Sequence, residues 1–237
     1  MATFTRGFTI TLFCFFLIVK SFGQSPESFI SMHLKNQTYK NGKVVEFESD
    51  YYFNRENGEL IIHGNIPKEY IKKSNRFGEV KVYFPVNNTV SLKQSILYSS
   101  QNELLFFFLS NNFFDLGLSK EGYSIANTIM DGAHQIVTWE TNKQDSPIPK
   151  IELVYDNDKP IYAAYFNSKN EIARKIYYYN YEFFQSFMMP KKVTQISYST
   201  NGDSIVQRNT YSDFKITSLP SSQYFNFKVP ENAKILE

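Results

Sequence analysis

The sequence predicts a mainly β protein, a single curved antiparallel sheet of about eleven strands. From residue 43 onward, apolar and polar side chains alternate with a period of two in short runs. Turn signals such as Asn57-Gly58 and Asp131-Gly132 separate these runs. No linker or internal repeat divides the chain. We therefore expect one domain, with an N-terminal helix and an apolar lid or plug helix packed on the sheet.

The N-terminal helix is expected over residues 26–38. Ser25-Pro26-Glu27 has the composition of a helix start, with a capping serine, a proline and an acid in the first turn. Apolar and aromatic residues then follow at helical spacing, at Phe29, Ile30, His33 and Leu34. Asn41-Gly42 ends the segment.

The strands are expected where the period changes to two. They include residues 43–53, 59–66, 79–84, 134–141, 191–199 and 204–216, with a last strand at 224–229. Alternating runs of this kind are typical of an antiparallel sheet with one buried and one wet face. Two helices are too few to cover so wide a sheet. Either the sheet closes into a barrel, or it stays open and the helices fill its concave side.

The second helix is expected within Gln101–Asn112. The run Leu104–Leu109 is apolar on all sides, which fits neither strand alternation nor a surface helix. It is far shorter than the roughly 20 residues that cross a bilayer. We expect a helix that is buried or that fills a groove.

The N-terminus has the pattern of a secretory signal peptide over residues 1–23. Arg6 precedes an apolar run, and Ser21-Phe22-Gly23 supplies small residues for cleavage before Gln24. An uncleaved anchor helix is the alternative. The remaining domain, residues 24–237, would act outside the cytoplasm, and the periplasm is the expected location.

Charge and cysteine content exclude several classes of protein. The chain has 25 Lys and Arg against 23 Asp and Glu, and the excess of two lies in the predicted signal peptide as Arg6 and Lys20. A balanced domain does not suit binding to nucleic acid, which depends on neutralising phosphates. The one cysteine, Cys14, excludes a disulfide framework and a multi-cysteine metal site.

No catalytic constellation is found. His33, His63 and His134 lie in unrelated segments without metal-ligand spacing, and no nucleophile elbow or phosphate-binding loop occurs. We expect a protein that is not an enzyme and needs no cofactor or metal. The 23 Phe and 17 Tyr are the unusual feature. An incompletely filled concave face rich in such residues would suit a flexible apolar ligand, because each buried methylene contributes roughly 0.8 kcal/mol.

The order of motifs resembles the outer-membrane lipoprotein carrier (LolA-like) family of Gram-negative bacteria. A signal peptide and short helix lead into the hairpin Val45-Glu46-Phe47 … Gly58-Glu59-Leu60-Ile61-Ile62. Ile66-Pro67 and the segment Gly78–Pro85 follow, and the chain closes with Phe225-Asn226-Phe227-Lys228-Val229-Pro230. The Phe-Gly-Gln cleavage context resembles exported proteins of Bacteroidetes. In well-studied carriers a basic residue precedes the strand proline, where this chain has Ile66.

The resemblance implies that the sheet forms an unclosed (half) β-barrel with an apolar lid or plug helix. It implies a monomeric periplasmic carrier whose concave face takes the acyl chains of lipoproteins or other lipids. An inner-membrane ATPase complex would load it and an outer-membrane acceptor would unload it. The lid would consist of Leu104, Leu105, Phe106, Phe108 and Leu109. The lipid-binding cavity would be lined by Val45, Phe47, Tyr51, Phe53, Leu60, Ile62, Val80, Val82, Phe84, Trp139 and Leu153.

Two other functions fit the sequence. The protein could be an envelope sensor or scaffold of the same fold, without a transport function. Its apolar helix within Gln101–Asn112 would then dock on a partner. It could also be a carbohydrate-binding protein, in which tyrosines such as Tyr177 and Tyr179 stack on sugar rings.

Overall fold

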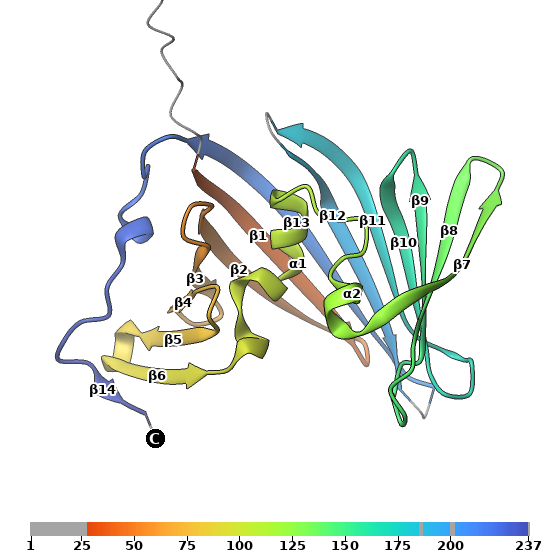
Figure 1. The fold of residues 1–237 in the computed structure, drawn as a ribbon. Helices are drawn as coiled ribbons and strands as arrows, with labels where there is room; N and C mark the ends of the chain where they lie inside the picture. The colour runs from red at the N-terminus through yellow and green to blue at the C-terminus, as the bar shows by residue number, and fades with distance from the viewer. Residues whose placement is uncertain (1–27, 185–186, 200–201, 237) are drawn as a thin grey trace, which may run out of the picture.

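A computed structural model describes residues 28–184, 187–199 and 202–236, and these form one open sheet of fourteen strands (Figure 1). The spatial order is β14-β6-β5-β4-β3-β2-β1-β13-β12-β11-β10-β9-β8-β7. Every neighbouring pair is antiparallel except β14 and β6, which are parallel. The strands β14 and β7 end the sheet, so the barrel is not closed. The predicted mainly β class and unclosed sheet are confirmed, with fourteen strands rather than about eleven.

The strands of the first half are β1 (Phe29–Lys40), β2 (Lys43–Asn54), β3 (Glu59–Ile66), β4 (Tyr70–Ser74), β5 (Glu79–Phe84) and β6 (Thr89–Gln94). The second half has β7 (Tyr123–Asp131), β8 (His134–Thr141), β9 (Lys150–Asp156), β10 (Lys159–Phe166), β11 (Ile172–Phe184), β12 (Phe187–Tyr198) and β13 (Ser204–Thr217). Two short helices, α1 (Leu104–Leu109) and α2 (Leu118–Glu121), lie between the halves in sequence. A two-residue strand, β14 (Lys234–Ile235), ends the described chain.

The predicted N-terminal helix is wrong for the part that the structure describes, because residues 29–40 form β1. Ile30, Met32 and Leu34 alternate with half-buried residues and point into the core. Phe29 packs on the opposite face, edge to face with Phe225 at 5.1 Å. The adjacent apolar residues Phe29 and Ile30 are therefore covered on opposite faces of a strand. They do not belong to one apolar stripe of a helix. The predicted cap at residues 25–27 and the predicted signal peptide lie outside the described residues.

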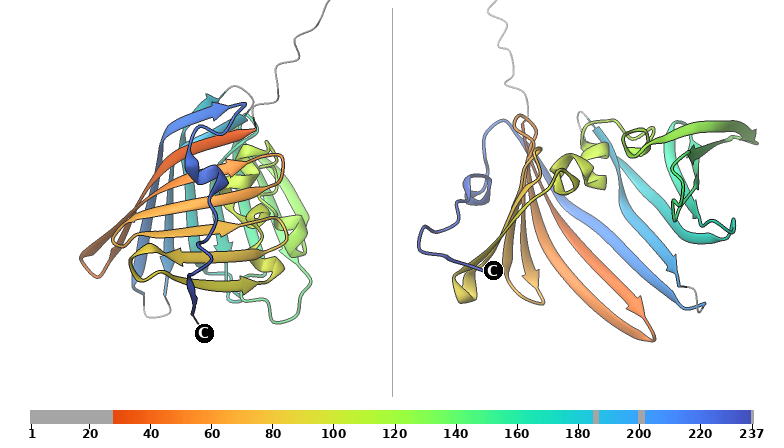
Figure 2. Two further views of the ribbon diagram at one scale, coloured as in Figure 1. Left: turned by 90° about the vertical axis from the view of Figure 1, so that its left-hand side faces the viewer. Right: turned by 60° about the horizontal axis from the view of Figure 1, so that its bottom comes forward.

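Strand β1 joins the two halves of the sheet. It pairs with β2 on one side and with β13, from the far end of the chain, on the other. A register shift between Ser31 and His33 marks an irregularity in the β1–β13 pair. Such an irregularity bends a strand and increases its twist. The sheet curves around α1 and α2, which lie inside the curve (Figure 1 and the right-hand view of Figure 2).

The convex face of the first half is covered by the C-terminal segment. Ile61, Ile71, Tyr83 and Val90 form a buried cluster on this face. Tyr224, Phe227 and Val229 pack against it, and the segment crosses β2–β6 (left-hand view of Figure 2). We call residues 223–236 the C-terminal strap. The predicted strand over 224–229 is wrong, because Gln223–Asn226 is a 3₁₀ turn and residues 227–229 belong to no strand. The strap packs on the sheet through side chains and then pairs with β6 through β14.

Candidate functional site

The concave face carries the main core, and α1 sits in it as a plug. Leu105, Phe108 and Leu109 are almost fully buried, while Leu104 and Phe106 are partly buried against the same cluster. The ring of Phe108 lies 5.9 Å from Tyr178 on β11, and Phe106 meets Phe53 on β2 edge to face at 6.0 Å. The five predicted lid residues therefore lie together. They fill the centre of the half-barrel instead of only covering it.

The chain leaves α1 through a loop that Asp115 organises. Its carboxylate accepts hydrogen bonds from the backbone N–H groups of Gly117 at 3.0 Å and Ser119 at 3.3 Å. Burial raises the pKa of Asp115, but the hydrogen bonds from Ser119 and Gly117 outweigh it and hold the pKa below its usual value. Gly117 has a φ of +85°, and a Cβ there would lie 2.5 Å from the ring of Phe107. The loop can follow this path only with glycine at 117.

Beside the plug, the concave face of β4–β6 is not filled. A pocket of about 500 Å³ has its apolar floor on β5, at Val80, Val82 and Phe84. We call it the β5 pocket. Its walls are Lys72 on β4 and Ser91 and Lys93 on β6. Residues of the segment 97–103 complete the lining. Its volume lies within the roughly 300–1,000 Å³ typical of small-ligand sites.

A second pocket, of about 770 Å³, lies on the other side of the segment 96–101. Its lining includes Phe107 and Gly117 but is rich in polar groups, among them Arg76, Lys120 and Lys143. Leu97 lines both pockets and is 78% exposed. Both pockets have charged residues in their linings. The β5 pocket differs because Val80, Val82 and Phe84 stand in one row on a single strand, which suits an extended hydrocarbon.

The structure divides the predicted cavity residues into three groups. Val80, Val82 and Phe84 line the β5 pocket. A second group lies against the plug or the core around it, and consists of Tyr51, Phe53, Leu60, Ile62, Trp139 and Leu153. Val45 and Phe47 lie farther along β2 on the same face and remain 47% and 42% exposed. Of these three groups, it is the β5 residues that line a pocket.

The sequence analysis missed a polar band on the concave face. Half-buried uncharged side chains follow one another across β1, β13 and β12, at Thr38, Asn36, Asn209, Gln207, Gln195 and Ser197. Asn36 Nδ2 donates to Asn209 Oδ1 at 2.5 Å, and Gln195 donates to Gln207 and Ser197. Val45 and Phe47 border this band, because they pair with Thr38 and Asn36. The signal was present as polar residues at inward positions of predicted strands.

The core around the plug holds tyrosines that stay neutral. Burial raises the pKa of Tyr178 well above its ordinary value, and burial raises the pKa of Tyr211 to about 12. The hydroxyl of Tyr155 donates to the carbonyl of Phe114. Among the described side chains, the Tyr178 hydroxyl and Trp139 Nε1 are buried without a hydrogen-bond partner. These groups add polarity but no negative charge to the interior.

An ion pair ties the plug segment to the sheet. Lys72 Nζ lies 3.0 Å from the Glu103 carboxylate, and Glu103 directly precedes α1. Ile66, which precedes the strand proline, is 42% exposed. The ion pair from β4 is thus one attachment of the plug segment, beside the packing of α1 in the core.

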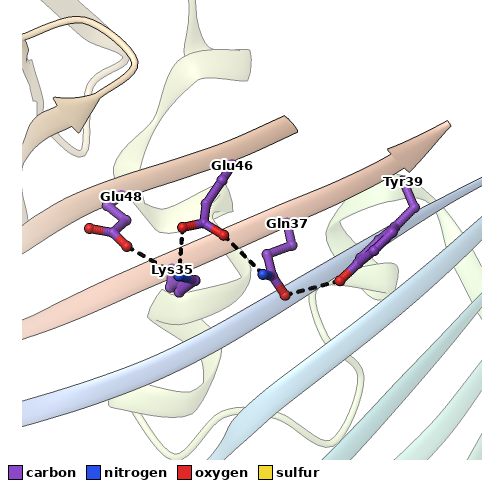
Figure 3. Close-up of polar contacts among 5 residues, drawn as sticks. All are labelled: Lys35, Gln37, Tyr39, Glu46 and Glu48. Atoms are coloured by element: carbon purple, nitrogen blue, oxygen red, sulfur yellow. Dashed lines mark hydrogen bonds and ion pairs between the residues drawn. The ribbon is translucent and has the colours of Figure 1, made fainter. Parts of the chain in front are cut away.

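Carboxylates on the outer face of β2 belong to a surface network (Figure 3). Lys35 Nζ lies 2.5 Å from Glu46 and 3.4 Å from Glu48, while Gln37 donates to Glu46 at 2.9 Å. The hydrogen bond with Lys35 lowers the pKa of Glu46, and the same bond raises the pKa of Lys35. Both carboxylates lie on the convex face and pair with a lysine, which is the arrangement of a solvated surface and not of an acid–base pair.

Among the residues that the structure describes, no three His, Cys, Asp or Glu side chains gather as metal ligands. No helix there has the length and hydropathy needed to cross a membrane.

Comparison with known proteins places the fold. No family model matches the sequence, and no curated protein matches it. Several solved structures, however, match the fold of this chain. A LolA superfamily protein from Nitrosomonas europaea is 12% identical and superposes with a TM-score of 0.55, covering 84% of this chain and 90% of that one. A putative outer-membrane lipoprotein-sorting protein domain from Vibrio parahaemolyticus is 13% identical with a TM-score of 0.56, covering 84% and 90%.

This chain has the LolA-like fold. A DUF1329 family protein from Desulfovibrio piger shares it, at 15% identity and a TM-score of 0.57 over 85% of this chain and 91% of that one. Identities this low establish the fold and not the ligand. Within the LolA-like fold of this chain, the β5 pocket is an unfilled surface with an apolar floor.

Proposed function

We propose that the protein is a carrier that binds acyl chains of lipoproteins or other lipids and moves them toward the outer membrane. One observation carries the proposal: a LolA-like half-barrel keeps an apolar pocket of about 500 Å³ beside its plug helix. The pocket floor is built from Val80, Val82 and Phe84, which need no charged partner to hold a hydrocarbon. Burial of about ten methylenes would contribute on the order of 8 kcal/mol before ordering costs.

The plug sets the capacity of such a carrier. Because Phe108 and Leu109 are 1% exposed, the centre of the half-barrel is occupied while α1 stays in place. Cargo enters the β5 pocket first, and a larger cargo requires α1 to move. The Lys72–Glu103 ion pair connects the pocket wall to the start of α1, so a ligand in the pocket touches the element that would move.

The test is lipid binding with two matched variants. The purified folded protein is extracted with organic solvent for mass spectrometry, and uptake of a fluorescent acyl probe is titrated. Val82→Glu places a charge on the pocket floor and should abolish uptake. Phe47→Glu, on the same concave face but outside the pocket, should leave uptake near the wild-type level. No extracted lipid together with no uptake would refute the carrier function.

Export to the periplasm is part of the proposal and rests on the predicted signal peptide of residues 1–23. Loading by an inner-membrane ATPase complex and delivery to an outer-membrane acceptor follow from the LolA-like fold as proposals, as do a monomeric state and the absence of enzymatic activity. Expression of the full chain in a Gram-negative host, fractionation and N-terminal sequencing should give a periplasmic protein that starts at Gln24.

A carbohydrate-binding role is the second candidate, favoured by one surface. Tyr177 and Tyr179 on the convex face of β11 are each 38% exposed, and Tyr162 lies 5.1 Å from Tyr177. Aromatic faces exposed in a row can stack on sugar rings. Binding to a glycan array that Tyr177→Ala abolishes would favour this role. The sensor alternative, in which α1 docks on a partner, is less favoured because α1 is buried in its own core.

A further inference from the structure

The charges that face the β5 pocket leave an excess of one positive charge. Lys72 and Lys93 supply two ammonium groups, and Glu103 supplies one carboxylate. Glu103 pairs with Lys72 at 3.0 Å. Among the described residues no carboxylate lies within ion-pair distance of Lys93, whose Nζ is 6.0 Å from the ring of Tyr98. Lys93 is therefore the cation available to a ligand.

Lys93 stands at one end of the apolar floor. The register pairs Val80 with Lys93, Val82 with Ser91 and Phe84 with Thr89 across β5 and β6. The apolar strip runs from Val80 to Phe84, roughly 13 Å along the strand. A chain lying on this strip would place one end beside the Lys93 ammonium group.

The strip is one strand wide. Beside Val80 and Val82 the inward residues are polar: Lys72 and Ser74 on β4, and Ser91 and Lys93 on β6. Leu97 and Tyr98, from the segment after β6, add apolar surface to the lining. Because neighbouring strands are about 4.8 Å apart, the floor itself offers apolar contact to one hydrocarbon chain and not to several side by side. The buried tyrosines near the plug are neutral, so they do not oppose an anion.

We propose that the β5 pocket selects a single-chain amphiphile with an anionic head, a carboxylate or a phosphate, whose tail lies on Val80, Val82 and Phe84 and whose head pairs with Lys93. This inference rests on the proposed lipid-binding function and narrows its ligand. A neutral lipid of the same chain length has the same tail contacts but lacks the ion pair.

The test compares charged and neutral ligands of one chain length at pH 8 and low ionic strength. Palmitate is matched with methyl palmitate, and palmitoyl lysophosphatidate with monopalmitoylglycerol. Each anion should bind about fivefold more tightly than its neutral partner, as an exposed ion pair allows, and the preference should shrink as salt is added. A preference shown by only one anion would identify the head as carboxylate or phosphate.

Variants locate the preference. Lys93→Gln should make charged and neutral ligands bind equally, and Lys93→Arg should keep the preference. Lys81→Gln is the matched control, because Lys81 lies on β5 but pairs with Lys73 and Leu92 on the convex face. It should change nothing.

The outcomes separate this inference from the function on which it rests. Equal binding of anions and neutral lipids by the wild type would overturn the anionic-head proposal and leave the carrier function standing. A preference that Lys93→Gln retains or that Lys81→Gln removes would overturn the assignment to Lys93. Failure of all four ligands to bind would overturn both proposals.

Discussion

Single residues decide the path of the loop that follows the plug. Asp115 receives two backbone hydrogen bonds, which link the end of the Phe113–Leu116 segment to the start of α2. Its carboxylate is stabilised as an anion in the folded state, so its folded pKa lies below the unfolded value near 3.8.

We predict that Asp115→Asn lowers the free energy of unfolding by about 1 kcal/mol at pH 7, the usual cost of losing a capping acceptor. The contribution of the carboxylate is complete above the unfolded pKa and is lost as the pH falls through the lower folded pKa. Urea titrations at pH 7, 5, 4 and 3 should show the two proteins converging below about pH 3.8. Asp131→Asn, at an exposed hairpin end, serves as the control. A difference that is constant with pH would contradict the prediction.

Gly64 is required by a close approach of side chains. A Cβ at this position on β3 would lie 2.1 Å from the ring of Tyr70 on β4. We predict that Gly64→Ala destabilises the protein by about 1–3 kcal/mol, as overpacking does. The double variant with Tyr70→Ala tests the cause in a thermodynamic cycle. The cost of Gly64→Ala should disappear in the Tyr70→Ala background, and an unchanged cost would show that the ring is not responsible.

The residue scale also shows why the first element was predicted wrongly. Phe29, Ile30, His33 and Leu34 fit a helical stripe, but Ile30, Met32 and Leu34 also fit a strand. The choice depends on Phe29, which is covered by Phe225 from the other end of the chain. A contact between residues so distant in sequence leaves no trace in a local pattern.

At the scale of elements, α1 could be predicted because its sequence fits nothing else. Leu104–Leu109 is apolar on all sides, and the structure buries four of its six residues, Leu105, Phe107, Phe108 and Leu109. What could not be predicted was how deeply it enters. The vacant space beside it depends on the side-chain volumes of β4, β5, β6 and the segment before α1, which periodicity does not measure.

We predict that Phe108→Ala lowers the free energy of unfolding by about 3–5 kcal/mol, because a fully buried ring is replaced by a cavity. Phe183→Ala is the matched control, since Phe183 is 73% exposed, and it should cost less than about 0.5 kcal/mol. Thermal and urea unfolding of both variants provide the comparison. Similar costs for the two substitutions would mean that α1 is not packed as a plug.

At the scale of the whole molecule, the strap gives the sheet a second core on its outer face. Tyr224 stacks between Tyr52 at 5.1 Å and His63 at 4.4 Å, and Phe227 meets Tyr83 at 5.9 Å. The sequence analysis assigned one apolar and one polar face to the sheet. It could not place Ile61 and Ile71 outward, because the residues that cover them lie about 160 positions later.

We predict that the double substitution Tyr224→Ala and Phe227→Ala lowers the free energy of unfolding by about 2–3 kcal/mol, through loss of apolar burial and ring contacts. Leu219→Ala, at a residue that is 74% exposed just before the strap, should have little effect. Urea unfolding measures both. A loss no larger than that of Leu219→Ala would show that the strap does not stabilise the sheet.

The pairing of β1 with β13 constrains the order in which the sheet can assemble during synthesis. Residues 29–40 find their second neighbour only in residues 205–217, so the two halves cannot be joined while the chain is incomplete. Pairing across so long a loop is slow and comes late. During synthesis the β1–β13 pairing therefore cannot form until the last strands have been made. A chain truncated before Ser204 would leave β1 as an unpaired edge strand, open to pairing with another chain.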